Sequence, residues 1–465
     1  MRLFVSFAAV LLLLSSNAVL FSQDFSEQAQ VELKVDLPFF DLPYQPHIMG
    51  SMGYGFFHTY GSMSMNQSLS LSMGVYSSMH YGMKKLYDSL DLDPVWKNII
   101  YYGGTAAGLL GFAYIFPFGY PWVKQEFTRS ILSRHGIGSN NGRYDIPIII
   151  NPTGFTDDQL IHLKATSPVD FIRLSASVTE GYSLFSERMA RNYFFYDLDD
   201  LSFVPALIAT WVNAGITGAA IAHEYGVINC DSQFIDPMYK DDKGQTDRFF
   251  YGEQTPNWVY DLFRPDEPYA ARGAHPSGDG SVARYIKFEQ LTDDERRYLL
   301  IHSWLSYLNY ASPLLYSFNS FELGDSGFLW NFALHHYLTS FGGDVSATMF
   351  LKKGAFNMAF ALHNYFNYQN YFPAVEAELV DYQLNLGKLG FLLSPRVIIG
   401  MQPKDQVFKT SSPEFLGLFG LRVDYMASRH FLPYLDFIVK TDGWVAGNEY
   451  LSSSASVRLG VSMRF

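Results

Sequence analysis

The residue types with the clearest catalytic potential stand together at the end of an apolar segment, in Ala222-His223-Glu224-Tyr225-Gly226-Val227. Histidine and glutamate are common metal ligands and water-activating groups in hydrolytic sites. No phosphate-binding glycine motif or serine-nucleophile elbow occurs in a strand-turn-helix context, so nucleotide binding and the ordinary hydrolase folds have no support. His223 and Glu224 are therefore the starting point for any chemical hypothesis.

His223 and Glu224 resemble the first two positions of the His-Glu-x-x-His helix of zinc-dependent metallohydrolases. The resemblance implies that His223 is a zinc ligand and that Glu224 polarises the attacking water. Val227 occupies the position of the second histidine, so the missing ligands must come from other segments. We expect His302 and Glu322 to be the best candidates.

His335 and His336 are further imidazoles that could complete such a site, although adjacent residues usually face opposite ways. The alternative for His223 is purely structural. A histidine near the C-terminus of a helix is favoured by the helix dipole, and Gly226 is typical of a residue that ends a helix.

Composition excludes some partners and limits how the fold is stabilised. The 465 residues carry a formal net charge of -12, so the chain has no basic surface to neutralise nucleic-acid phosphates. Aromatic residues make up 17% of the chain, as two aromatic girdles at membrane interfaces would require. Because Cys230 is the only cysteine, no internal disulfide is available.

The N-terminus has the pattern of a secretory signal peptide. Arg2 precedes an apolar run over 3–14, and Ser16-Asn17-Ala18 follows with small residues suited to cleavage. We expect a signal peptide over 1–18, with cleavage as late as residue 23. The alternative is an N-terminal membrane anchor. No cysteine follows the apolar run, which excludes a lipid-anchored lipoprotein.

The last ten residues alternate strictly between apolar and polar side chains. The apolar positions end on an aromatic residue and comprise Val457, Leu459, Val461, Met463 and Phe465. Successive side chains of a strand point to opposite faces, so this strand has one wholly apolar face. These five residues resemble the closing strand of bacterial outer-membrane β-barrel proteins. The alternative is a half-buried strand of a soluble sheet.

The resemblance to outer-membrane barrels implies that the terminal residues are a signal read by the barrel-assembly machinery. It also implies that the lipid bilayer is a partner and that the bacterial outer membrane is the location. The strand pattern at 343–465, with turn residues at near-regular spacing, predicts the C-terminal strands of an antiparallel barrel. The N-terminal barrel strands are expected within 24–80, from the alternation over 31–37 and 62–75.

Residues 81–342 are expected to form a helix-rich insertion that fills or caps the barrel. Four segments in and beside it lack any formally charged residue, at 98–123, 201–222, 298–321 and 326–343. Each is about long enough to span a bilayer as a helix, but their glycines and polar residues favour helices buried in protein.

Two capping boxes support helix starts in this insertion, at Thr156-Asp-Asp-Gln159 and Thr292-Asp-Asp-Glu295. Alternation over 172–179 predicts one strand that interrupts the helices. Residues 236–297 are rich in proline and charge, which predicts a long polar loop.

The fold class expected is a transmembrane antiparallel β-barrel of about 8–12 strands with a large helical insertion. The function expected is structural, in assembly, or in narrow transport, because a filled lumen leaves no wide pore. One alternative is a barrel-housed zinc hydrolase that uses His223 and Glu224. The other is a polytopic helical inner-membrane protein with a periplasmic β-domain.

Overall fold

The computed structural model describes residues 31–47, 61–115, 120–143, 150–196, 203–226, 254–274, 280–284 and 286–465. The expected signal peptide lies outside these residues, as do residues 236–253, 275–279 and 285 of the expected polar loop. Apart from Val31, the described residues belong to one compact unit, Glu32–Phe465.

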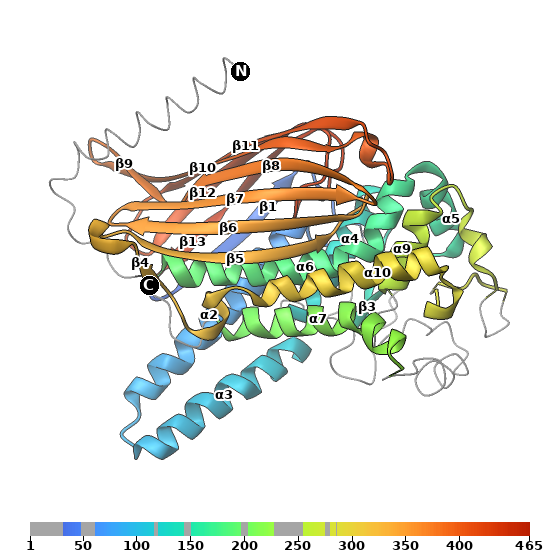
Figure 1. Cartoon of the computed structure of the whole chain (residues 1–465). Coiled ribbons are helices and arrows are strands. Elements are labelled where there is room, and N and C mark those ends of the chain that lie inside the picture. The colour runs from blue at the N-terminus through green and yellow to red at the C-terminus, as the bar shows by residue number, and fades with distance from the viewer. Residues whose placement is uncertain are drawn as a thin grey trace. The chain divides into compact units, whose positions relative to one another are not determined.

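An antiparallel sheet of eleven strands dominates the C-terminal part of this unit (Figure 1). Along the sheet the order is β1-β13-β12-β11-β10-β8-β7-β6-β5-β4, with β9 paired to β10. The strands are β1 (Lys34–Leu42), β4 (Phe321–Glu322), β5 (Leu329–Leu338), β6 (Gly343–Lys353), β7 (Phe356–Asn367), β8 (Asn370–Leu379), β9 (Tyr382–Leu386), β10 (Leu389–Pro403), β11 (Pro413–Tyr425), β12 (Phe431–Lys440) and β13 (Ser454–Arg464).

The terminal strand has its apolar face outward and its polar face inward. Ser456, Arg458 and Ser462 are buried, whereas Leu459 is 42% exposed and Phe465 is 44% exposed. Val457, Val461 and Met463 are partly exposed. The strand alternates as predicted, and its polar side chains face the interior of the protein, opposite to the orientation expected for a half-buried strand of a soluble sheet.

The same orientation holds across the neighbouring strands. Register places Leu459 beside Leu435 of β12, and Leu435 beside Val423 of β11. From Phe391 to Met401 of β10, and throughout β11, β12 and β13, the residues that share this outer face are uncharged. The outer face of this part of the sheet is therefore a continuous apolar surface.

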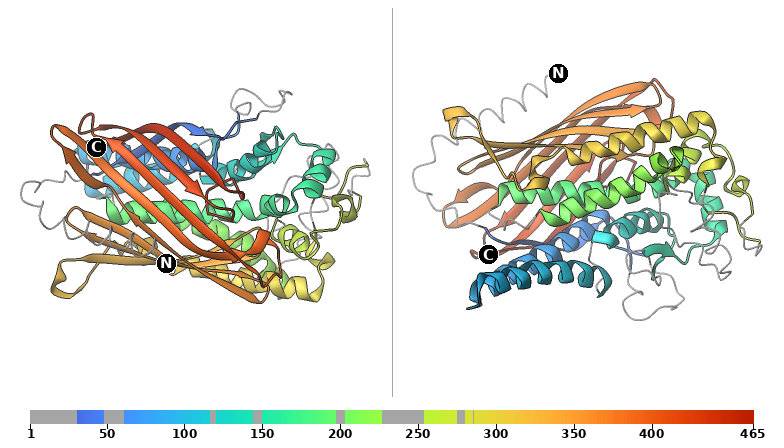
Figure 2. Two further views of the ribbon diagram at one scale, coloured as in Figure 1. Left: turned by 90° about the horizontal axis from the view of Figure 1, so that it is seen from above. Right: turned by 60° about the horizontal axis from the view of Figure 1, so that its bottom comes forward.

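Helices lie against the inner face of the sheet and beside its open side (Figure 2). Short 3-10 helices, and a two-stranded sheet of β2 (Asn140–Arg143) and β3 (Ile150–Thr153), connect them. The α-helices described are α2 (Met65–Ser89), α3 (Pro94–Ile115), α4 (Tyr120–Arg134), α5 (Asp157–Thr166), α6 (Pro168–Phe195), α7 (Val204–Glu224), α9 (Gln254–Phe263) and α10 (Asp293–Leu305).

Helix α6 is the central helix, and the sheet curves over it (Figures 1 and 2). Phe185 of α6 and Phe127 of α4 are fully buried and share one core with Tyr365 of β7 and Leu416 of β11. The main core therefore lies between α6, its neighbouring helices and the inner face of the sheet.

The described strands do not close into a barrel, so the predicted closed wall is wrong. β1 pairs with β13, as expected for a wall that joins both ends of the chain, but β1 and β4 are the two ends of the sheet. The free edge of β5 is occupied by side chains of other segments. His336 N donates to Asn309 Oδ1 at 2.6 Å, and Ser183 Oγ donates to His336 O at 3.3 Å.

The expected strand over 62–75 is also wrong, because these residues begin α2. Ser64 and Gln67 form a capping box that starts the helix. The buried residues of its first turns, Met65, Leu69 and Ser72, follow helical spacing. Small serines are buried here beside apolar residues, so the alternation of methionine and serine does not mark two different faces.

Three further segments differ from their predicted type. The expected strand over 172–179 lies within α6, where Arg173 and Ser177 are as deeply buried as Ile172, so both parities face protein. The uncharged segment over 326–343, expected to be helical, contains strand β5 and extends the sheet beyond its predicted start at 343. The expected loop over 236–297 includes helix α9 and the first part of α10.

Both predicted capping boxes are confirmed, at Thr156 for α5 and at Thr292 for α10. Helix α7 covers most of the uncharged segment predicted at 201–222 and extends beyond it to Glu224, and it is not wholly buried. By length and composition, Val204–Ala222 is the described helical segment able to cross a membrane, and half of it is buried. Such a helix is weak evidence, because core helices meet the same criterion.

Replacing Asn309 with leucine tests how the free edge of β5 is held. Asn309→Leu leaves the buried amide of His336 without its acceptor, and we expect a loss of about 1–3 kcal/mol in the free energy of unfolding. Chemical unfolding followed by tryptophan fluorescence measures this loss. The exposed control Asn385→Ala is expected to change stability by less than about 0.5 kcal/mol. Equal effects of the two substitutions contradict the edge-capping role.

Candidate functional site: a charged cavity beside an inserted loop

A cavity of about 180 Å³ lies between α2, α6 and the inner face of the sheet. Its walls carry six acidic and six basic side chains, although the neighbouring core is apolar. The basic side chains are Lys34, Arg188, Arg191, Arg396, Arg422 and Arg458. Such a concentration of charge inside a protein requires partners, because an unpaired ion in a medium of low dielectric constant is strongly destabilised.

Ion pairs across strands and between sheet and helix supply most of these partners. Arg396 of β10 forms a bidentate pair with Glu376 of β8, with its shorter contact at 2.7 Å. Arg191 of α6 pairs in the same way with Glu378 of β8. These fork-like contacts fix both the distance and the orientation of the side chains.

The strands nearest the chain ends continue the network. Arg422 of β11 contacts Asp36 of β1 at 2.9 Å, and Lys34 lies 3.9 Å from Asp36. Arg458 of β13 contacts Asp436 of β12 at 3.2 Å. The charged residues occupy inward positions of their strands, so the alternation that exposes apolar residues outside also brings these charges together.

Arg188 of α6 differs from the other five basic side chains. Its Nη1 donates to Asn66 Oδ1 of α2 at 3.0 Å, and within the described residues it has no carboxylate partner. Glu187 precedes it in the helix, but the Glu187 carboxylate accepts a hydrogen bond from the Tyr337 hydroxyl of β5. The cavity therefore contains one arginine whose charge is not directly neutralised by a protein carboxylate.

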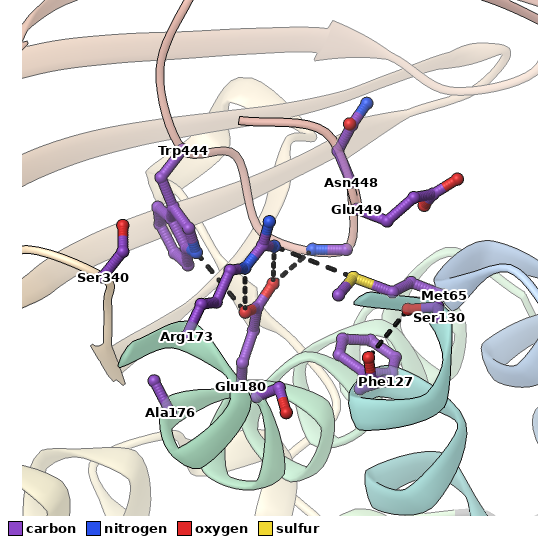
Figure 3. Close-up of polar contacts among 12 residues, drawn as sticks. Met65, Phe127, Ser130, Arg173, Ala176, Glu180, Ser340, Trp444, Asn448 and Glu449 are labelled. Carbon is purple, nitrogen blue, oxygen red and sulfur yellow. Dashed lines mark hydrogen bonds and ion pairs between the residues drawn. The ribbon is translucent and has the colours of Figure 1, made fainter. Parts of the chain in front are cut away.

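The connection between β12 and β13, residues 441–453, folds inward against α6 (Figure 3). Trp444 and Val445 are buried in the main core. The Gln402 side chain of β10 holds the loop at Trp444, because its Nε2 donates to Trp444 O at 2.7 Å and its Oε1 accepts from Trp444 N at 2.8 Å. The loop is thus part of the packed interior.

Glu180 of α6 connects this loop to the helix (Figure 3). Its carboxylate accepts hydrogen bonds from Arg173 Nη2 at 2.7 Å, from Gly447 N at 3.0 Å and from Trp444 Nε1 at 3.4 Å. The side chains of Arg173 and Glu180 are both fully buried. A single carboxylate therefore neutralises a buried arginine and binds the loop at two residues.

Gly447 brings the loop backbone next to the cavity. Its φ of +74° is in the left-handed region that favours glycine. A Cβ at this position would lie 2.5 Å from Leu184 Cδ2 and 3.7 Å from Arg188 Nη2. The close approach leaves no room for a side chain, so the loop borders the cavity at Arg188.

Glu449 lies in the same loop, and burial raises its pKa to about 7. The negative charge of Asp41 contributes in the same direction, whereas the positive charges of Arg458 and Arg173 oppose it. Glu449 as a whole residue is 2% exposed. Its neutral form is therefore favoured in the folded protein at mildly acidic pH.

The structure separates the residues that the sequence singled out for zinc chemistry. Glu224 is exposed at the end of α7, and His223 lies beside it in the helix, with its side chain outside the description. His302 of α10 is buried, and its Nδ1 lies 3.0 Å from His336 Nε2. Glu322 of β4 is exposed.

Glu322 and His302 are positioned near opposite ends of β5. Glu322 pairs with Leu329, whereas His302 contacts His336. Since a strand advances about 3.3 Å per residue, these two points lie roughly 20 Å apart along β5. Within the described ranges, no three side chains of histidine, cysteine, aspartate or glutamate are placed to hold a metal ion. The zinc site stays a prediction.

The charged cavity was not among the predicted sites, although the sequence contains a signal for it. Arg396, Arg422 and Arg458 stand at polar positions of three strands whose other parity is apolar. Charged residues at such positions indicate an enclosed polar interior when the apolar face is the exposed one. The partners Asn66 and Arg188 come from helices distant in sequence, and no local pattern relates them.

Comparisons with known proteins do not identify a relative: no family model, no curated protein and no solved structure matches this chain.

The pair formed by Arg173 and Glu180 can be tested with a double-mutant cycle. We expect Glu180→Leu alone to cost about 3–5 kcal/mol in the free energy of unfolding, because it leaves a buried arginine unpaired. Adding Arg173→Met is expected to restore part of that stability. Thermal or chemical unfolding of wild type, both single variants and the double variant gives the coupling. Strictly additive losses contradict a direct interaction.

The raised pKa of Glu449 predicts that the stability of the protein depends on pH. Its folded-state pKa of about 7 lies above the ordinary value of 4.5, so the folded protein retains a proton that the unfolded chain releases between these values. Glu449 therefore makes its full contribution to the free energy of unfolding below about pH 4.5. This contribution is lost as the pH rises through about 7. We expect wild type to lose stability over this range relative to Glu449→Gln. Parallel thermal-unfolding profiles of the two proteins contradict this assignment.

Proposed function

We propose that this protein is an integral protein of the bacterial outer membrane, in which the apolar face of the sheet contacts lipid and the charged interior is closed by helices and the inserted loop. The observation that carries the proposal is the inverted orientation of the strands. Arg458 is buried while its neighbour Leu459 is exposed, and the same pattern repeats on β12.

Exposing the apolar face of this sheet to water is unfavourable. Soluble proteins rarely expose contiguous apolar patches larger than a few hundred Å², and larger ones mark contacts with membranes or other proteins. On this sheet the exposed apolar side chains span neighbouring strands, as in Phe415 and Phe419 of β11 and Leu435 and Phe437 of β12. A lipid environment solvates these side chains, and the ion-paired interior stays away from it.

The strand lengths agree with this proposal. A tilted strand needs about 9–11 residues to cross the hydrocarbon core. The strands that carry the apolar face range from the 10 residues of β12 to the 15 residues of β10. Ordinary strands of soluble proteins are about 5–6 residues long, so the length favours a membrane-spanning wall.

Helices on the open side of the sheet have apolar exposed faces too. Trp211 of α7 is 69% exposed, and Trp304 of α10 is 55% exposed. Residues 298–321, which include the end of α10 and two 3-10 helices, carry no formally charged side chain. These faces suit lipid as well, so we propose a mixed wall, with strands on one side and helices on the other.

The interior favours a structural or assembly role, or narrow transport, over an open pore. A water-filled channel requires a continuous lumen. Here α6 and the loop over 441–453 occupy the space beneath the sheet, and the charged cavity there measures about 180 Å³. Any passage through this interior requires movement of the loop or of the ion pairs that line the cavity.

The terminal strand suits the proposed role as an assembly signal. Its five apolar positions point outward, and the ring of Phe465 stacks on His430 with centroids 5.1 Å apart. Phe465 N donates to Leu33 O, and Phe465 O accepts from Leu33 N, so the end of the chain is paired with the residues that precede β1. The last strand therefore lies between β1 and β12 and joins the N-terminal strand to the rest of the sheet.

Membrane fractionation tests the proposal. We expect wild type to resist carbonate extraction and to sediment with the outer membrane, and deletion of Phe465 to prevent assembly. Leu435→Arg places a charge on the outer face and is expected to cost about 2–4 kcal/mol near the bilayer midplane. The matched control Ser428→Arg adds the same charge in an exposed turn and is expected to leave assembly unchanged.

Three outcomes contradict parts of this proposal. Wild type in the carbonate-soluble fraction rules out an integral membrane protein. Sedimentation with the inner membrane favours the polytopic helical alternative. Equal assembly of Leu435→Arg and Ser428→Arg shows that the outer face of the sheet does not contact lipid.

A further inference from the structure

We propose that the cavity binds a small oxyanion, a carboxylate or phosphate group, through the guanidinium of Arg188. This inference concerns the interior of the protein and does not depend on its location. It stands on three observations: a cavity, an arginine inside it without a carboxylate partner among the described residues, and neutral hydrogen-bonding groups that line the same cavity.

The charge pattern of the cavity points to Arg188. Each of the other five basic side chains lies within an ion pair with a carboxylate of a described residue. Arg188 instead has one hydrogen bond, to the amide oxygen of Asn66. Arg191, Arg396 and Arg458 are close enough that their positive charges act on it. Glu187 acts in the opposite direction. Because Arg191, Arg396 and Arg458 are paired with carboxylates, an anion bound here is attracted chiefly by Arg188 itself.

The neighbouring carboxylate does not fill this role. Side chains of successive residues on a helix are directed about 100° apart. Glu187 is hydrogen-bonded to the hydroxyl of Tyr337 on β5, whereas Arg188 is directed toward α2 and the loop at Gly447. The two neighbours on α6 therefore interact with different parts of the protein.

Arginine geometry and the adjacent residues suit an oxyanion. A guanidinium presents several N–H donors in a planar fork that matches the two oxygens of a carboxylate or phosphate. Only one nitrogen of Arg188 has a hydrogen bond to a described residue. Ser70 of α2 and Asn192 of α6 also line the cavity and supply uncharged donors.

Cavity size limits the ligand class. Sites for drug-sized molecules usually measure about 300–1,000 Å³. A volume of about 180 Å³ is smaller, yet it exceeds the space of one water molecule several times over. The cavity therefore suits inorganic phosphate or a short carboxylate with some water, and it excludes a lipid headgroup that carries its acyl chains.

Isothermal titration of the purified full-length protein with sodium phosphate, and separately with sodium acetate, tests the proposal directly. Sodium chloride at equal ionic strength is the reference. We expect saturable binding of at least one oxyanion by wild type, together with a rise in thermal midpoint that chloride does not produce, since a ligand that binds the folded state stabilises it. Arg188→Gln is expected to weaken that binding by at least tenfold.

The matched control is Arg429→Gln, which removes the same charge at an exposed position in the turn between β11 and β12. It is expected to bind as wild type does. If Arg188→Gln does not fold, Asn66→Ala keeps the arginine and is expected to change the affinity. Absence of oxyanion binding by wild type overturns the proposal. Equal binding by Arg188→Gln and Arg429→Gln also overturns it, because the anion then binds elsewhere.

Discussion

Charge burial is the constraint on which the rest of the structure depends. An ionised side chain inside a protein loses its hydration, and only a well-placed partner offsets that loss. Here the partners come from different elements: Arg191 of α6 pairs with Glu378 of β8, and Arg422 of β11 pairs with Asp36 of β1. The ion pairs therefore determine where α6 lies under the sheet and how the two ends of the chain meet.

The open sheet makes the helices necessary. A closed barrel satisfies every backbone group through neighbouring strands, whereas β5 has a free edge that must find other partners. Asn309 and Ser183 provide them, and α6 lies directly beside that edge. Because side chains already occupy these backbone groups, another strand cannot add to β5 there. Helical packing thus satisfies this edge and fills the space beneath the sheet at the same time.

Sequence patterns predicted strands well where the two faces of an element differ in chemistry. The alternation over β13 and the capping boxes at Thr156 and Thr292 are local signals, and each led to the correct element. Prediction failed where both faces are buried. In α2 and α6, small or paired polar residues such as Ser72 and Arg173 lie inside the protein, so alternation no longer separates inside from outside.

The charged cavity was even harder to predict from sequence patterns than the secondary structure. Inward charges on the strands could be recognised from their parity, but the lack of a carboxylate partner at Arg188 depends on where α2 and the loop at Gly447 are placed. That placement follows from the hydrogen bonds of Glu180 and from a backbone conformation that favours glycine. The loop cannot move away from the cavity without breaking the hydrogen bonds that Gly447 N and Trp444 Nε1 donate to Glu180, the carboxylate that pairs with Arg173. Access to Arg188 and the stability of the buried pair are therefore linked through one short segment of chain.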